Sequence, residues 1–280
     1  MQLFRANIAH FPTPNTASST FAEDIVVIHD GGLVIDGKKI IATGSFSSMR
    51  EQYPNALLHD HKDSWILPGL IDSHLHYPQT ESIASYGEQL LSWLENYTFP
   101  TEKQFANVEH AQKIAKVFLQ QLLKNGTTTG FVFSSVHQGC CNALFSAASE
   151  IDMAIVAGKV CMDRNCPADL QDCPETAQKD SAVLIEKWHN TGRNRYAITP
   201  RFAPTSSEAQ LAALGELATQ YKDVFVQTHL SENVDEIAWV KSLFPKASGY
   251  LDVYDKYNLV RPRAVFGHGI HLSSEEWQRL

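Results

Sequence analysis

The sequence predicts an α/β protein in which a small β-domain precedes a barrel of parallel strands. From Trp65 onward, apolar stretches of strand length alternate with stretches of helical spacing, which is typical of parallel strands joined by crossover helices. Before that point the chain contains short strand-like stretches and glycine turns. We therefore expect a small β-domain over residues 1–65 and a barrel over residues 66–280.

The first 65 residues contain three short runs that predict strands, at 25–28, 31–35 and 39–44. We expect these strands to form a small β-sandwich-like domain. Residues 18–20, which are Ser, Ser and Thr, are expected to lie in a loop.

The barrel region contains six strand candidates, at 66–72, 127–133, 154–160, 196–199, 224–228 and 264–267. Apolar residues recur at helical spacing between them, at 108–124, 142–151, 176–188, 208–221 and 234–244. This gives six strands and at least five helices.

Composition narrows the class of protein and of ligand. The 280 residues are 44% hydrophobic and 19% charged, which is enough apolar material for one large core and a small second domain. The net charge of −8 argues against binding to nucleic acid or to an anionic membrane, and favours a small or neutral ligand. Five cysteines without a Cys-x-x-Cys pair predict reduced thiols, and the sequence has no apolar leader or span, so we expect a cytoplasmic protein.

Two histidines stand one residue apart where the first barrel strand ends. Residues i and i+2 of a strand face the same side, so His74 and His76 can reach one metal ion. Pro68-Gly69 interrupts the chain before this strand and Pro78 turns it afterwards, as expected for a barrel strand that presents ligands at its carboxyl end. The alternative is a pair of surface histidines on an edge strand.

Further candidates follow the fifth and sixth strands. His229 and His268 each stand at a strand's carboxyl end, and in a parallel barrel these ends open on one rim. Neutral imidazoles suit zinc, and a coordination position left to water would make the site catalytic. The alternative for each histidine is a hydrogen-bonded residue of a loop or of the core.

Glu232 lies three residues beyond His229, where a carboxylate can take a proton from metal-activated water and pass it to a leaving group. Its alternative is an exposed glutamate at a helix start, because Ser231 can act as a cap before the acidic residues Asp235 and Glu236.

The end of the fourth strand carries Arg201 and Phe202. A cationic donor beside an aromatic face suits a planar heterocycle that bears a carbonyl. No lysine occurs in residues 198–204, and a bridging lysine is common in two-metal sites, so one metal is expected. A solvated arginine next to a packing phenylalanine is the alternative.

These segments together resemble the amidohydrolase superfamily, and within it the guanine deaminase family. The Pro-Gly-Leu-Ile-Asp-x-His-x-His element at 68–76 marks the superfamily. The Trp-Leu-x-x-Tyr-Thr-Phe-Pro stretch at 93–100 and the Gly-Lys-Val-Cys-Met-Asp stretch at 158–163 narrow it to the guanine deaminases, and the resemblance covers nearly all 280 residues.

The resemblance implies a (β/α)8-barrel enzyme that converts guanine to xanthine and ammonia in purine catabolism, by addition of metal-activated water at C2. It implies a homodimer when complete and one Zn²⁺ per chain, although ligand type alone does not distinguish zinc from iron. The implied roles are metal ligation by His74, His76 and His229, guanine contact by Gln79, Arg201 and Phe202, and catalysis by Glu232 and His268.

Members of this family continue through two further strands and an aspartate ligand after the eighth strand, whereas this sequence ends at Leu280. We therefore expect about six of the eight strands, a site without its fourth protein ligand, and an isolated chain that self-associates and is inactive. Two other readings stay open. One is a mononuclear amidohydrolase for a different amino- or chloro-substituted heterocycle, and the other is an inactive metal-binding fragment.

Overall fold

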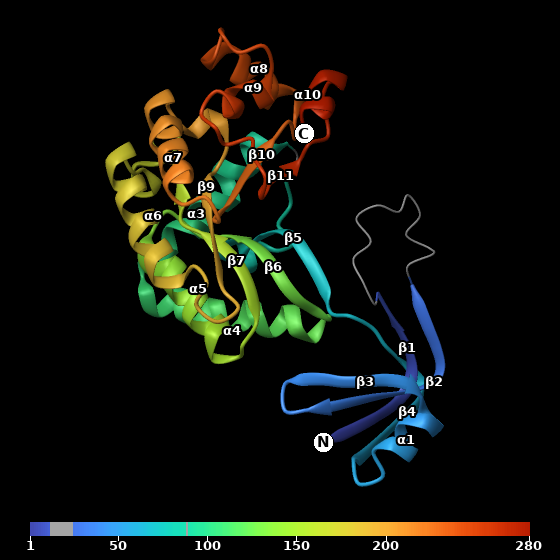
Figure 1. The fold of residues 1–280 in the computed structure, drawn as a ribbon. Helices are drawn as coiled ribbons and strands as arrows, with labels where there is room; N and C mark the ends of the chain where they lie inside the picture. The colour runs from blue at the N-terminus through green and yellow to red at the C-terminus, as the bar shows by residue number, and fades with distance from the viewer. Residues whose placement is uncertain (12–24, 88) are drawn as a thin grey trace. The chain divides into compact units, whose positions relative to one another are not determined.

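The computed structural model describes residues 1–11, 25–87 and 89–280, and the loop expected at 18–20 lies outside these ranges. The chain divides into two compact units, Met1–Gly69 and Leu70–Leu280 (Figure 1). Within the described ranges, no helix is both long enough and apolar enough to span a membrane.

The first unit is a four-stranded sheet with one helix. Its strands are β1 (Gln2–His10), β2 (Val26–Asp36), β3 (Lys39–Ser45) and β4 (Leu57–Ile66), in the order β3-β2-β1-β4. Strand β1 is antiparallel to β2 and parallel to β4. Helix α1 (Phe46–Gln52) packs through Met49 against a small core that contains Leu3 and Val34. The expected small β-domain is therefore present as a single sheet in the described residues.

The runs at 25–28 and 31–35 were expected to be two separate strands, but both lie in the single strand β2, which contains the glycine pair at 31–32. A Cβ on Gly31 would come within 2.7 Å of Ile8, and one on Gly32 within 2.8 Å of Met49. These glycines therefore allow close packing instead of forming a turn. Strands β1 and β4 have no clear period-2 alternation in the sequence, and the sequence analysis missed both.

The second unit is built on a parallel sheet. Its strands are β5 (Leu70–His76), β6 (Thr127–Phe133), β7 (Ala154–Gly158), β8 (Val160–Cys161), β9 (Arg195–Pro200), β10 (Phe225–Leu230) and β11 (Ala264–His268). The order is β11-β10-β9-β7-β6-β5, with β8 paired to β9, and each of these pairs is parallel. The predicted parallel barrel strands are confirmed, although the first runs from Leu70 to His76 instead of over residues 66–72, and Ile66 ends β4. The third expected strand is divided between β7 and β8, with Lys159 between them.

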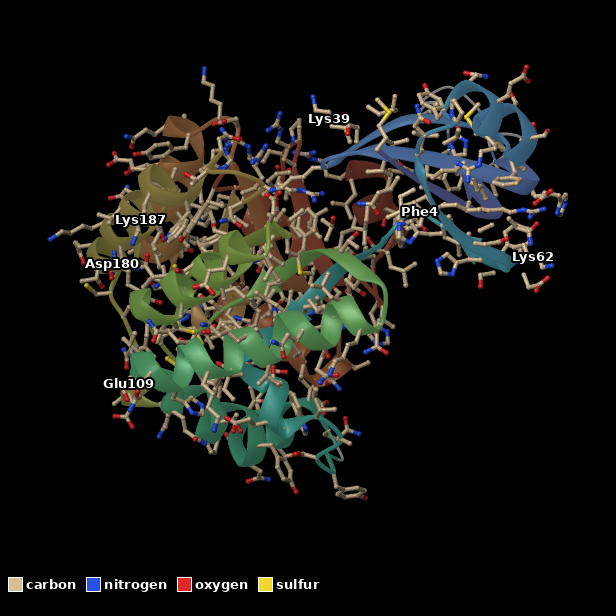
Figure 2. The ribbon with its side chains drawn as sticks, turned by 90° about the horizontal axis from the view of Figure 1, so that it is seen from below. Phe4, Lys39, Lys62, Glu109, Asp180 and Lys187 are labelled. Carbon is tan, nitrogen blue, oxygen red and sulfur yellow. The ribbon has the colours of Figure 1, made fainter. Side chains whose placement is uncertain are left out.

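The main helices lie along one side of this sheet in Figure 1. They are α4 (Val108–Lys124), α5 (Gln138–Glu150), α6 (Pro174–Trp188) and α7 (Glu208–Gln220), followed by α8 (Val234–Leu243), α9 (Tyr250–Asp255) and α10 (Ser274–Arg279). The apolar faces of α4 to α9 meet the strands in one large core, whereas α10 contributes no buried residue. Charged side chains such as Glu109 on α4 and Lys187 on α6 point outward (Figure 2).

Short helical turns connect β5 to α4. They are η2 (Tyr77–Ser82), α2 (Leu90–Trp93), η3 (Leu94–Thr98), α3 (Phe99–Lys103) and η4 (Gln104–Ala106). This connection is long for a strand-to-helix loop in an α/β unit, and long loops of this kind often carry function. It supplies several of the side chains that line the candidate site.

Candidate functional site

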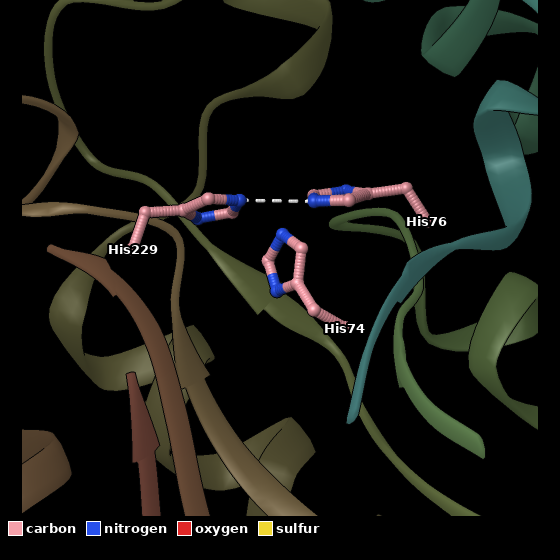
Figure 3. Close-up of side chains that lie close together, drawn as sticks. All are labelled: His74, His76 and His229. Atoms are coloured by element: carbon pink, nitrogen blue, oxygen red, sulfur yellow. Dashed lines mark hydrogen bonds between the residues drawn. The ribbon is translucent and has the colours of Figure 1, made fainter. Parts of the chain in front are cut away.

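Three histidines from two strands converge at the carboxyl end of the sheet. Strand β5 presents His74 and His76, β10 presents His229, and the ligand atoms of all three lie within 4.8 Å of one another. Figure 3 shows the Nε2 atoms of His76 and His229 aimed at each other, 2.9 Å apart, with the His74 ring beside them. Residues 153 positions apart in the sequence thus form one cluster, as the strand-end argument predicts.

The donor set fits a metal ion. Nδ1 of His229 lies 2.7 Å from the carbonyl oxygen of Arg201, and this contact assigns the proton to Nδ1 and leaves the Nε2 lone pair facing the cluster. Nδ1 of His76 is buried without a hydrogen-bond partner among the described residues. Burial lowers the pKa of His74 to about 4 and holds the pKa values of His76 and His229 well below the usual range of histidine. The imidazoles are therefore neutral near pH 7, as metal ligation requires.

The neighbouring strand β11 comes close enough to fix one of the rings. A Cβ on Gly267 would lie 2.6 Å from Cε1 of His74, so only glycine leaves room for this ring at this position. Gly267 therefore helps the histidine cluster to form, because it leaves space for the His74 ring.

Glu232 and His268 face each other at the same rim. Oε2 of Glu232 lies 3.2 Å from Nε2 of His268. Burial, helped by the negative charge of Glu236, raises the pKa of Glu232 to about 7. A carboxyl group with such a pKa can hold a proton and release it at neutral pH.

The segment that follows Glu232 corrects one expectation. Asn233, and not Ser231, caps α8, because its side chain accepts hydrogen bonds from the backbone N–H groups of Asp235 and Glu236. Glu236, an acidic residue in the first turn of α8, is fully buried. Its carboxylate accepts hydrogen bonds from Tyr250 Oη and from the N–H groups of Glu232 and Asn233.

Arg201 is fixed by a carboxylate that the sequence analysis did not identify. Nη1 of Arg201 donates to Oε2 of Glu102 at 2.7 Å and to Oε1 at 3.0 Å. Arg201 is 2% exposed and Glu102 is fully buried, so Arg201 is not a solvated surface arginine. Gln79 Nε2 donates to the same carboxylate at 3.3 Å. Phe202 is buried and meets Trp239 edge to face.

One cavity of about 260 Å³ collects every candidate residue. Its lining consists of His74, His76, Gln79, Leu90, Trp93, Leu94, Arg201, Phe202, His229, Glu232 and His268. The sequence analysis had not assigned Leu90, Trp93 or Leu94 to the site, although the last two belong to a motif that carried the resemblance. Glu102 gave no signal of its own, because a lone glutamate in the first turn of a short helix usually reflects the helix dipole.

Comparisons with known proteins agree with this geometry. The model of the amidohydrolase family matches residues 65–280. The chain is 50% identical over 254 residues to the guanine deaminase of Escherichia coli (strain K12), which covers 90% of this chain and 58% of that protein. It is 38% identical over 283 residues to a probable guanine deaminase of Deinococcus radiodurans, which covers 99% of this chain and 63% of that protein.

Solved structures agree with the sequence comparisons. The structure of E. coli guanine deaminase matches with a TM-score of 0.96 and 46% identity, over 100% of this chain and 65% of that one. The structure of guanine deaminase from C. acetobutylicum with bound guanine in the active site matches with a TM-score of 0.88 and 33% identity, over 99% and 64% of the two chains. The chain therefore spans less than two thirds of the length of each of these relatives.

Proposed function

Because the chain belongs to the amidohydrolase family, we propose that its site hydrolyses guanine to xanthine and ammonia. One observation carries the proposal: a single cavity joins a neutral three-histidine cluster, a carboxyl group with a pKa of about 7, and an arginine fixed for hydrogen bonding. The choice of guanine is supported by the similarity to guanine deaminases, one of which was solved with bound guanine in its active site. Guanine breakdown in the cytoplasm is the proposed setting.

His74, His76 and His229 are the proposed ligands of one metal ion, and we propose zinc because it suits neutral imidazoles. A bound zinc ion lowers the pKa of a coordinated water molecule and so supplies the nucleophile at neutral pH. The role of the histidines is to remain unprotonated, which their burial favours. The contact of His229 with the carbonyl oxygen of Arg201 fixes its tautomer and ring orientation.

Glu232 is the proposed proton-transfer residue. It accepts a proton from the attacking water and passes it to the purine ring as C2 becomes tetrahedral. It then takes the remaining proton of the hydroxyl added at C2 and passes it to the departing amino group, which leaves as ammonia while the C2=O bond forms. His268 lies 3.2 Å away and orients this carboxyl group. Burial keeps the pKa of Glu232 near the working pH, where it serves as base and as acid in one cycle.

Gln79, Arg201 and Phe202 are the proposed guanine contacts. Arg201 directs a rigid cationic donor into the cavity for the purine carbonyl, while Phe202 and Trp93 provide aromatic surface for a flat ring. Among the described residues that line this cavity, no feature favours a different amino- or chloro-substituted ring over guanine.

The test measures ammonia release from guanine, adenine, cytosine and an aminotriazine by the natural protein that contains this chain, loaded with zinc. We expect turnover of guanine to exceed that of the other rings. The His74→Ala variant should lose both turnover and bound metal, as measured by elemental analysis. Equal turnover of adenine and guanine would contradict the proposed substrate, and wild-type metal content in His74→Ala would remove His74 from the site.

A further inference from the structure

Glu102 is a fully buried carboxylate with no part in the proposed chemistry. It lies in α3, within the long connection between β5 and α4, and it accepts hydrogen bonds from two side chains that line the cavity. Burying a charge is costly unless the charge is paired and hydrogen-bonded. Glu102 meets this condition through Arg201, whose guanidinium also lies over the Phe99 ring, 5.4 Å from its centroid.

The ion pair between Arg201 and Glu102 determines which polar atom of the Gln79 side chain can bind a ligand. An ionised carboxylate accepts hydrogen bonds and cannot donate them, so the Gln79 side chain must turn its NH₂ group toward Glu102. The amide oxygen of Gln79 is then the polar atom left for the cavity, and it acts as an acceptor. Arg201 presents only donors, whatever its environment.

The end of the cavity beside Glu102 therefore presents one donor group, from Arg201, and one acceptor group, from Gln79, and both side chains are held by the same carboxylate. This pair is complementary to a C=O next to an N–H, which is the neutral lactam group of a heterocycle. When the lactam loses its N–H proton, its nitrogen carries a lone pair in place of a hydrogen-bond donor. This lone pair would face the Gln79 amide oxygen, and the two acceptors would repel each other. Glu102 also neutralises the charge of Arg201, so the guanidinium group attracts the anion of the ligand only weakly.

We infer that Glu102 is a positioning residue that makes this end of the cavity select a neutral lactam over its anion, by fixing the Gln79 amide and neutralising Arg201. The inference rests on the proposed function and names the form of ligand that the site takes.

The test measures binding of guanine by titration calorimetry to the zinc-loaded natural protein carrying Glu232→Gln, in which conversion is too slow to disturb the titration. Binding is measured at neutral pH and at an alkaline pH where guanine has lost its N1 proton, so that the affinities for the neutral lactam and for its anion are compared. When Glu102→Gln is added, Arg201 keeps an unpaired charge and the Gln79 amide is free to turn. We expect binding of neutral guanine to weaken by about tenfold or more, and the anion-to-neutral affinity ratio to rise by about tenfold or more.

Two further variants separate positioning from general damage. Glu95→Gln makes the same chemical change at an exposed residue of the same connection and should leave the affinity ratio unchanged. The double variant E102Q/R201Q removes both buried charges, so it provides a folded protein if the single variant is unstable. It should bind neutral guanine weakly without gaining affinity for the guanine anion.

An unchanged ratio in a folded, zinc-loaded Glu102→Gln protein would overturn the inference, and so would a similar gain in anion affinity in the double variant. Both results leave the proposed function intact, because wild-type protein still binds and converts guanine. If wild-type protein neither binds nor converts guanine, the proposed function fails, and the inference fails with it.

Discussion

At the scale of single residues, the proposed reaction depends most on Glu232. Burial and the nearby negative charge of Glu236 together raise the pKa of this carboxyl group to about 7. Glu236 is itself held by Tyr250 and by two backbone N–H groups, so the local field on Glu232 is fixed by the structure. This arrangement suits a group that must both accept and donate protons.

Replacing Glu232 by glutamine should leave zinc and guanine binding intact, because the side chain keeps its size and its place in the cavity. Turnover should fall by about 10²-fold or more, the usual effect of removing a positioned acid–base group. Steady-state kinetics with a parallel binding titration checks this. Turnover equal to wild type would show that Glu232 carries no proton, and Glu275→Gln, at an exposed glutamate, serves as the control.

The buried histidines predict a pH dependence of stability for the metal-free chain. The pKa of His74 is about 4 in the folded state, against an ordinary value of 6.5, so between these values the unfolded chain binds more protons. The free energy of unfolding should therefore fall as the pH is lowered through this range, by about 1 kcal/mol per pH unit for one such histidine.

Urea denaturation at a series of pH values measures this slope. His74→Gln, which has no titrating group at this position, should show a shallower slope, while the buried His76 and His229 retain theirs. Identical slopes for the two proteins would contradict the role of burial at His74.

The cluster of three histidines could be predicted from the sequence, because strand periodicity and strand ends determine which side chains can meet. The role of Glu102 could not be predicted in this way. Its importance arises from the path of the connection between β5 and α4, which brings Glu102 of α3 within hydrogen-bond distance of Arg201, the residue after β9, and no local pattern encodes that path. The cap at Asn233 was missed because Ser231 and Asn233 are both good capping residues.

At the scale of elements, the contact between β11 and β5 decides whether the cluster of three histidines can form. Gly267 on β11 leaves space for the His74 ring at the end of β5. Elements with strong apolar periodicity, such as α4, appeared where the sequence predicted them. Helix α5 begins earlier than expected, at Gln138, and the short helix α9 was missed, because brief segments give weak periodic signals.

The Gly267→Ala substitution should displace the His74 ring and weaken zinc binding by about tenfold or more, because ligand misplacement is costly at metal sites. Competition with a chelator measures the affinity. In a His74→Ala background the same substitution should have no further effect. An additional loss of affinity in the double variant would show that Gly267 acts by another route.

At the scale of the whole molecule, β5 and β11 are the two edge strands of the sheet in the part of the chain that the structure describes. Leu70 and Ile71 on β5 are more than half exposed. Exposed strand edges with apolar side chains promote pairing between chains. Whether the two compact units fold separately, with a boundary near residue 65 as expected from the sequence, stays a prediction.

A polypeptide of residues 1–280 should therefore self-associate, and sedimentation velocity would show species larger than a monomer. Ile71→Lys, which places a charge on the exposed part of β5, should reduce this association. A monomeric wild-type polypeptide over a wide concentration range would contradict the prediction.

The central claim is that one metal ion, held by the three histidines, makes this cavity a guanine deaminase site. The most direct measurement follows conversion of guanine to xanthine by the natural protein as zinc is added back to its metal-free form. We predict that activity rises linearly and reaches its plateau at one zinc per chain, and that His229→Ala abolishes the rise. Guanine conversion that is independent of added metal, or a rise that persists in His229→Ala, would contradict the account.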